Sequence, residues 1–132
     1  MILLDASVLI AHFEGADGNH DAATNLLAAH ALEPFAASVA TLAEVYVGAA
    51  RANQAKRLGQ LLDRLGVQSL DLPAGGARRL GELRAGTQLK MPECCVLYTA
   101  EYHGASIATF DEKLATRADE LGLAVARAEA PD

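Results

Sequence analysis

Residues 91–111, MPECCVLYTAEYHGASIATFD, predict a buried helix that is followed directly by a buried strand. Pro92 suits the first turn of a helix, where its missing N–H costs no hydrogen bond. The residues after it leave hardly any polar face, so this helix is expected to be packed on several sides. Gly104 is a typical helix stop. Because a helix that packs beside the strand following it runs antiparallel to that strand, Glu93 and Asp111 are expected at the same edge of the sheet.

The rest of the chain continues this alternation of strands and helices. Apolar runs predict four further strands, at residues 2–4, 35–39, 67–72 and 123–126. Helical spacing and stop signals predict six further helices, at residues 7–13, 20–32, 41–52, 54–65, 75–85 and 112–121. Such alternation is typical of an α/β fold. We therefore expect one domain, residues 1–127, with a parallel sheet of about five short strands and helices on both faces. A frayed tail is expected at residues 128–132.

Composition limits the class of protein. With 132 residues, the chain is long enough for one domain with an ordinary core. Its net charge of −6 argues against a broad basic surface for nucleic acid, but not against a small site where metal ions or local cations meet phosphate. No apolar run approaches the roughly 20 residues of a membrane span. Cys94 and Cys95 are adjacent in the predicted helix and are expected as core residues in a reducing compartment. The sequence thus predicts a soluble, cytoplasmic protein.

Four acidic residues fall at one edge of the predicted sheet. Right-handed crossovers send every loop after a parallel strand out at the same edge, where ligands bind. Asp5 ends the first strand, Glu44 lies in the first turn of the helix after the second strand, and Glu93 and Asp111 join them as described above. No Lys or Arg directly flanks any of the four. A hard divalent cation such as Mg²⁺ or Mn²⁺ would compensate these charges and bridge to a substrate phosphate, as in metal-assisted hydrolysis.

Each acid also has a purely structural explanation. Thr41 and Glu44 match a capping box. Glu93 in a first helical turn complements the helix dipole, and Asp5 and Asp111 suit helix N-caps. The convergence of all four on one edge favours a shared metal site over four separate caps.

Four segments carry these acids in order across nearly the whole chain, namely MILLDASVL, TLAEV, MPECCVL and ATFDEKLA. They resemble the signature segments of PIN-domain ribonucleases, most closely the VapC-type toxins of bacterial toxin–antitoxin pairs. The resemblance implies a parallel sheet, RNA cleavage that depends on Mg²⁺ or Mn²⁺, inhibition by a small VapB-type antitoxin, and a homodimer. It matches Asp5, Glu44 and Asp111 to acids of the family. Glu93 stands where the family usually has Asp.

Other polar residues carry weaker assignments. Ser7 and Thr109 are expected either to support the acids through hydrogen bonds or to act as helix caps. Arg84 and Lys90 precede the buried helix and are candidates for holding an RNA backbone. The arginines at 78–79 are expected on a solvated helix face.

Three rival hypotheses remain, and the first shares the predicted architecture and an acidic pocket. A phosphoacceptor receiver domain would use paired acids after the first strand and one after the third, for which Asp71 is the candidate. A haloacid-dehalogenase-like phosphatase would need an acid where this chain has Ser7. A non-catalytic interaction domain predicts no affinity for metal ions.

Overall fold

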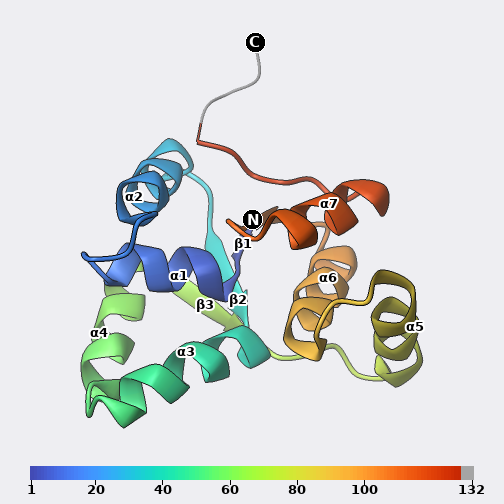
Figure 1. Ribbon diagram of the computed structural model, residues 1–132, viewed down its shortest axis with the longest axis horizontal. Coiled ribbons are helices and arrows are strands. Elements are labelled where there is room, and N and C mark those ends of the chain that lie inside the picture. Colours follow the sequence, from blue (N-terminus) through green and yellow to red (C-terminus); the bar gives the residue numbers. More distant parts are fainter. Residues whose placement is uncertain (129–132) are drawn as a thin grey trace.

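The computed structural model describes residues 1–128 and places a four-stranded parallel sheet between two groups of helices (Figure 1). The strands are β1 (Ile2–Leu4), β2 (Phe35–Ser38), β3 (Val67–Leu70) and β4 (Ser106–Ala108), and their spatial order is β3-β2-β1-β4. The helices are α1 (Ala6–Phe13), α2 (His20–Ala29), α3 (Val39–Arg51), α4 (Ala55–Leu65), α5 (Ala77–Thr87), α6 (Met91–His103) and α7 (Glu112–Glu120). The predicted α/β fold with a parallel sheet is confirmed.

The sheet separates two apolar cores, because alternate side chains of a strand point to opposite faces. Ile2 and Leu4 of β1 pack with residues of α1 to α4, whereas Leu3 of β1 and Ile107 of β4 pack with residues of α5 to α7. Figure 1 shows the same division, with α1 to α4 on one side of the sheet and α5 to α7 on the other. Helices therefore cover both faces, as predicted, and β1 is apolar throughout because both of its faces are buried.

The helix α6 has the features that the sequence predicts. Pro92 lies in its first turn, and Gly104 ends it in the left-handed conformation with φ of 64°. All seven residues from 94 to 100 are buried. Its position between α5, α3 and the sheet explains why it has no polar face.

The helix α3 begins earlier than predicted. Its N-cap is Ser38, the last residue of β2, whose Oγ accepts a hydrogen bond from the Ala40 N–H at 3.2 Å. Thr41 is therefore inside the helix, the proposed capping box does not form, and Glu44 lies in the second turn rather than the first. The helix begins earlier than predicted because β2 ends at a serine, whose side chain caps α3 directly.

The predicted fifth strand, residues 123–126, is present only as a single parallel bridge between Val125 and Ile107. Two backbone hydrogen bonds of 2.8 Å hold it, from the Ile107 N–H to the Ala124 carbonyl and from the Ala126 N–H to the Ile107 carbonyl. The predicted strand is shortened at its start, because the Leu123 N–H instead donates to the Ala118 carbonyl at the end of α7, at 2.9 Å. The predicted tail at 128–132 lies almost wholly outside the described residues, so its fraying stays a prediction.

The segment between β3 and α5 is fastened to α6 by Tyr98. The Tyr98 hydroxyl donates a hydrogen bond to the Pro73 carbonyl at 3.1 Å, and its ring lies against the α carbon of Gly76. Arg79 adds an ion pair with Glu101 of α6, Nη2 to Oε1 at 2.5 Å. Arg79 was expected on a solvated face. Its side chain is 40% exposed and also pairs with Glu101, because α5 packs against α6. Within residues 1–128, no helix combines the length and apolar character needed to cross a membrane.

Replacing Gly76 by Ala is expected to destabilise the protein, because a Cβ there would lie 2.4 Å from Tyr98 Cε2. Such overpacking costs about 1–3 kcal/mol, which urea unfolding can measure. Gly81→Ala, inside the helix that Gly76 precedes, is the control, since a Cβ there meets nothing within 4 Å. The control should be at least as stable as the parent, because Ala is a better helix former than Gly. Equal stability of parent and Gly76→Ala would contradict the described packing.

Candidate functional site

The four predicted acids line one small pocket of about 90 Å³ at the carboxyl ends of the strands. Asp5 directly follows β1 and Asp111 follows β4, which neighbour each other in the sheet. Glu44 and Glu93 come from α3 and α6, two helices in contact with each other. The pocket therefore lies where the strand order reverses, between β1 and β4, which is the place where open α/β sheets bind ligands. The structure brings all four acids together.

Asp5 is the most deeply buried of the four, with 6% of its surface exposed. Its Oδ1 accepts hydrogen bonds from Ser7 Oγ at 2.6 Å and from the Val8 N–H at 3.1 Å. Its Oδ2 accepts one from Thr109 Oγ1. Burial raises the pKa of Asp5 above its ordinary value, against the opposing effect of these three hydrogen bonds, and the nearby charge of Asp111 raises it further. The carboxylate is thus fixed in orientation and short of positive charge.

The hydroxyls of Ser7 and Thr109 connect Asp5 to the loop after β4. Ser7 Oγ also accepts a hydrogen bond from the Phe110 N–H at 3.0 Å, and Thr109 Oγ1 accepts one from the Asp111 N–H at 2.9 Å. Asp111 in turn caps α7, with its Oδ1 accepting from the N–H groups of residues 113 and 114. The capping explanation for Asp111 is therefore correct, and it fixes the carboxylate beside the pocket rather than removing it from the site.

Glu44 and Glu93 complete the acidic wall. Burial raises the pKa of Glu44, and the charges of Glu93 and Asp5 raise it further, while Lys90 acts in the opposite direction. Glu93 Oε2 is buried and has no hydrogen-bond partner among the described residues. A buried carboxylate oxygen without a donor is costly, so this atom is available to a cation or to a hydrogen-bond donor in the pocket.

The chemistry of this pocket suits a hard divalent cation, since all of its charged lining groups are carboxylates and one carboxylate oxygen is a buried acceptor without a partner among the described residues. In residues 1–128, no three His, Cys, Asp or Glu side chains already stand close enough to hold an ion without moving. Glu44 and Glu93 reach the pocket on long side chains, whereas Asp5 is fixed by three hydrogen bonds. Rotation of the two glutamates is the adjustment that would gather the donors.

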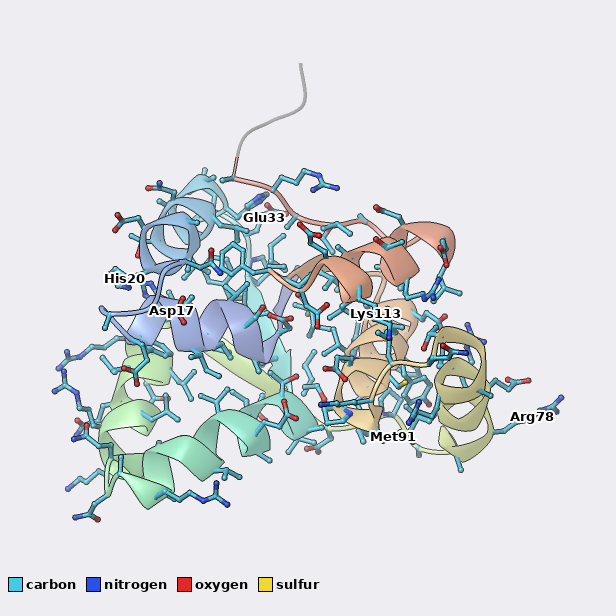
Figure 2. All side chains as sticks on the ribbon, viewed as in Figure 1. Asp17, His20, Glu33, Arg78, Met91 and Lys113 are labelled. Atoms are coloured by element: carbon cyan, nitrogen blue, oxygen red, sulfur yellow. The ribbon has the colours of Figure 1, made fainter. Side chains whose placement is uncertain are left out.

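The basic residues are arranged unequally around the pocket. Lys90 is the N-cap residue of α6 and lies near enough to Glu44 to influence its pKa. Arg84 is exposed on α5, does not line the pocket, and instead influences the pKa of Cys94. Arg78 points away from the body of the molecule (Figure 2), as expected for a solvated position. Asp71, on which the receiver hypothesis depends, is exposed and outside the pocket.

Two features of the site were missed by sequence reasoning. Thr41, interpreted as a helix cap, lines the acidic pocket and is 2% exposed. A larger groove of about 520 Å³ lies between α1, α3 and α4, and Glu44 lines both this groove and the acidic pocket. The spacing of apolar residues in α1 and α4 indicates buried faces, but not that part of these faces stays open to solvent.

Comparisons with known proteins agree with this architecture. The sequence model of the PIN domain matches residues 2–120. A chain of a toxin–antitoxin complex from Klebsiella pneumoniae is 30% identical, with 86% of this chain and 88% of that chain covered and a TM-score of 0.70. VapC20 of Mycobacterium tuberculosis, described as a sarcin–ricin loop cleaving toxin, is 17% identical, with 96% and 99% covered and a TM-score of 0.76. A chain of VapBC2 from Rickettsia felis, bound to a promoter DNA fragment, is 19% identical, with 95% and 97% covered and a TM-score of 0.73. The last two likenesses show a shared fold. No curated protein matches the sequence.

Replacing Asp5 by Asn is expected to change how the stability of the metal-free protein depends on pH. Because the folded-state pKa of Asp5 lies above its ordinary value of 3.8, the folded state binds this proton more tightly than the unfolded state does. The parent therefore loses stability as the pH rises from 3.8 through the raised pKa, whereas Asn does not titrate. Urea unfolding in EDTA, from about pH 4 to about pH 8, should show the variant gaining stability relative to the parent. Parallel curves would contradict the burial effect.

Proposed function

We propose that this chain, which belongs to the PIN domain family, is a metal-dependent endoribonuclease and the toxin of a toxin–antitoxin pair. The observation that carries the proposal is the single pocket lined by Asp5, Glu44, Glu93 and Asp111. The similar chains from a toxin–antitoxin complex and from a toxin that cleaves the sarcin–ricin loop support the same assignment. A receiver-like role has no support from Asp71, which lies outside the pocket.

Asp5, Glu93 and Asp111 are proposed to hold Mg²⁺ or Mn²⁺, with Glu44 contributing directly or through a water molecule. A divalent ion in such a site supplies a nucleophile near neutral pH and stabilises charge on the phosphoryl oxygens. Glu93 is one methylene longer than the aspartate that the family usually has at this position. The extra methylene extends its carboxylate from α6 into the pocket, where Oε2 has no hydrogen-bond partner among the described residues.

The other residues of the site position these acids and the substrate. Ser7 and Thr109 fix the Asp5 carboxylate through hydrogen bonds to both of its oxygens. Lys90 is the proposed contact to an RNA phosphate, because it lies beside Glu44 at the rim, and Arg84 is a more distant candidate. No His or Cys lines the pocket, so cleavage by a water molecule is favoured over a covalent intermediate. The products should carry 5′-phosphate and 3′-hydroxyl ends.

The parent protein is expected to cleave RNA with Mg²⁺ or Mn²⁺ and to lose that activity in EDTA. Incubation of the purified protein with total RNA, followed by analysis of fragment ends, measures both the activity and the mechanism. Asp5→Asn should reduce the rate by at least about a hundredfold, since misplacement of a reacting group by about 1 Å already has that effect. Products with 2′,3′-cyclic phosphate would contradict hydrolysis by water.

Two Glu93 variants serve as the matched pair in this assay. Glu93→Asp keeps the charge and should preserve or raise cleavage, whereas Glu93→Gln should reduce both cleavage and Mn²⁺ affinity. If Glu93→Gln equals the parent in both measurements, Glu93 is not a metal ligand and serves only the N-terminus of α6.

A small antitoxin is the proposed partner, and the groove between α1, α3 and α4 is its proposed binding surface. The groove is mostly apolar, with Ile10, Phe13 and Leu61 among its lining residues, which suits the apolar face of a partner helix. Because Glu44 also lines the acidic pocket, a segment leaving the groove would reach the acids. An Arg on that segment would pair with the carboxylates. We also propose that the toxin forms a homodimer.

Light scattering on the protein produced alone, and produced with the product of the neighbouring gene, is expected to show a dimer and a larger complex. A monomer in both samples would contradict both partner proposals. Ile10→Asp should weaken the complex, because Ile10 lines the groove and is 42% exposed. Leu32→Asp is the control, since Leu32 is fully exposed and outside the groove. Equal effects of the two variants would exclude the groove as the binding surface.

A further inference from the structure

Thr41 combines deep burial with a hydroxyl that has no hydrogen-bond partner among residues 1–128. It is 2% exposed, and it lines the acidic pocket together with Asp5, Glu44 and Glu93. Thr41 and Glu44 are three residues apart on α3, so they lie on the same face of this helix. Although the residue as a whole is almost fully buried, its hydroxyl is not one of the fully buried atoms without a partner among the described residues, so it keeps contact with the open space of the pocket that it lines.

The other buried threonines of the helices show why Thr41 differs. Thr87 Oγ1 donates to the Leu83 carbonyl at 2.6 Å, and Thr99 Oγ1 donates to the Cys95 carbonyl at 2.7 Å. Each therefore uses the carbonyl four residues earlier in its own helix. The residue four positions before Thr41 is Ala37, which belongs to β2. Because α3 begins at Val39, Thr41 has no helical carbonyl to bond, and its proton is available to the pocket.

The complementary atom is Glu93 Oε2 in the same pocket, a buried acceptor to which no group of residues 1–128 donates. The pocket's volume of about 90 Å³ also leaves room for a bridging water molecule, which needs polar partners on both sides. We propose that Thr41 is a positioning residue that holds the Glu93 carboxylate toward the centre of the pocket through one bridging water molecule. This inference rests on the proposed nuclease function for its effect on catalysis, but not for the Thr41–Glu93 interaction itself.

This role of Thr41 explains how the longer side chain of Glu93 is held in one orientation. A glutamate has one more rotatable bond than an aspartate, so its carboxylate needs an additional contact to stay in one orientation. Thr41 supplies that contact from α3, across the pocket from α6. Removal of a group that orients a metal ligand typically costs 10–100-fold in activity or metal affinity.

The catalytic test compares three variants on RNA. Thr41→Val keeps the shape but removes the hydroxyl, and it should lower kcat about tenfold or more with little change in KM. Thr41→Ser keeps the hydroxyl and should stay within about threefold of the parent. Thr99→Val is the control, because the Thr99 hydroxyl bonds only to its own helix, and its kcat should equal that of the parent. If Thr41→Ser is as impaired as Thr41→Val, the methyl packing of Thr41 matters rather than its hydroxyl, and the proposal is wrong.

A double-mutant cycle tests the interaction without any activity. Urea unfolding in EDTA is measured for the parent, Thr41→Val, Glu93→Ala and the double variant. The proposal predicts that the two effects do not add, because each single substitution removes the same interaction. Additive effects would overturn it. If the parent fails to cleave RNA, the proposed function is wrong, while the cycle still decides whether Thr41 positions Glu93.

Discussion

Asp5 brings a carboxylate to the end of the central strand β1, where almost no water reaches it. Hydrogen bonds from Ser7, Val8 and Thr109 hold it there, and the two hydroxyls also accept from the backbone after β4. This network joins the start of α1 to the loop that leads into α7. The position of Asp111 beside the pocket depends on the same network, because the Asp111 N–H donates to Thr109 Oγ1. The geometry of the site is thus set by its most buried acid.

The site concentrates negative charge at some cost in stability. Burial and mutual repulsion raise the pKa of both Asp5 and Glu44, and Lys90 opposes this effect only at Glu44. Four acids that served only as caps would have no reason to share one pocket. Asp111 shows that capping and a place in the site are compatible, since only its Oδ1 accepts the helix N–H groups. The same residue can therefore stabilise α7 and present its other oxygen to a ligand.

The acidic pocket and the apolar groove are linked through Glu44 and α3. One face of α3 contributes Thr41 and Glu44 to the pocket, while Val45 and Ala49 line the groove. A partner bound in the groove would therefore contact the helix that also positions the acidic wall. A partner bound in the groove would therefore inhibit the proposed toxin directly, because Glu44 lines both the groove and the acidic pocket.

The sequence alone determined the alternation of strands and helices and the buried character of α6. It also placed two acids of the site directly after strands and the other two in the early turns of helices. These features depend on local patterns, which are apolar periodicity, Pro92, Gly104 and the short runs before Asp5 and Asp111. The tertiary structure decided the order β3-β2-β1-β4, the capping of α3 by Ser38 and the reduction of the fifth strand to one bridge. It also turned Arg79 toward Glu101 and Thr41 into the pocket. Each of these outcomes depends on contacts between segments distant in the chain, whose burial and hydrogen-bond partners no local pattern specifies.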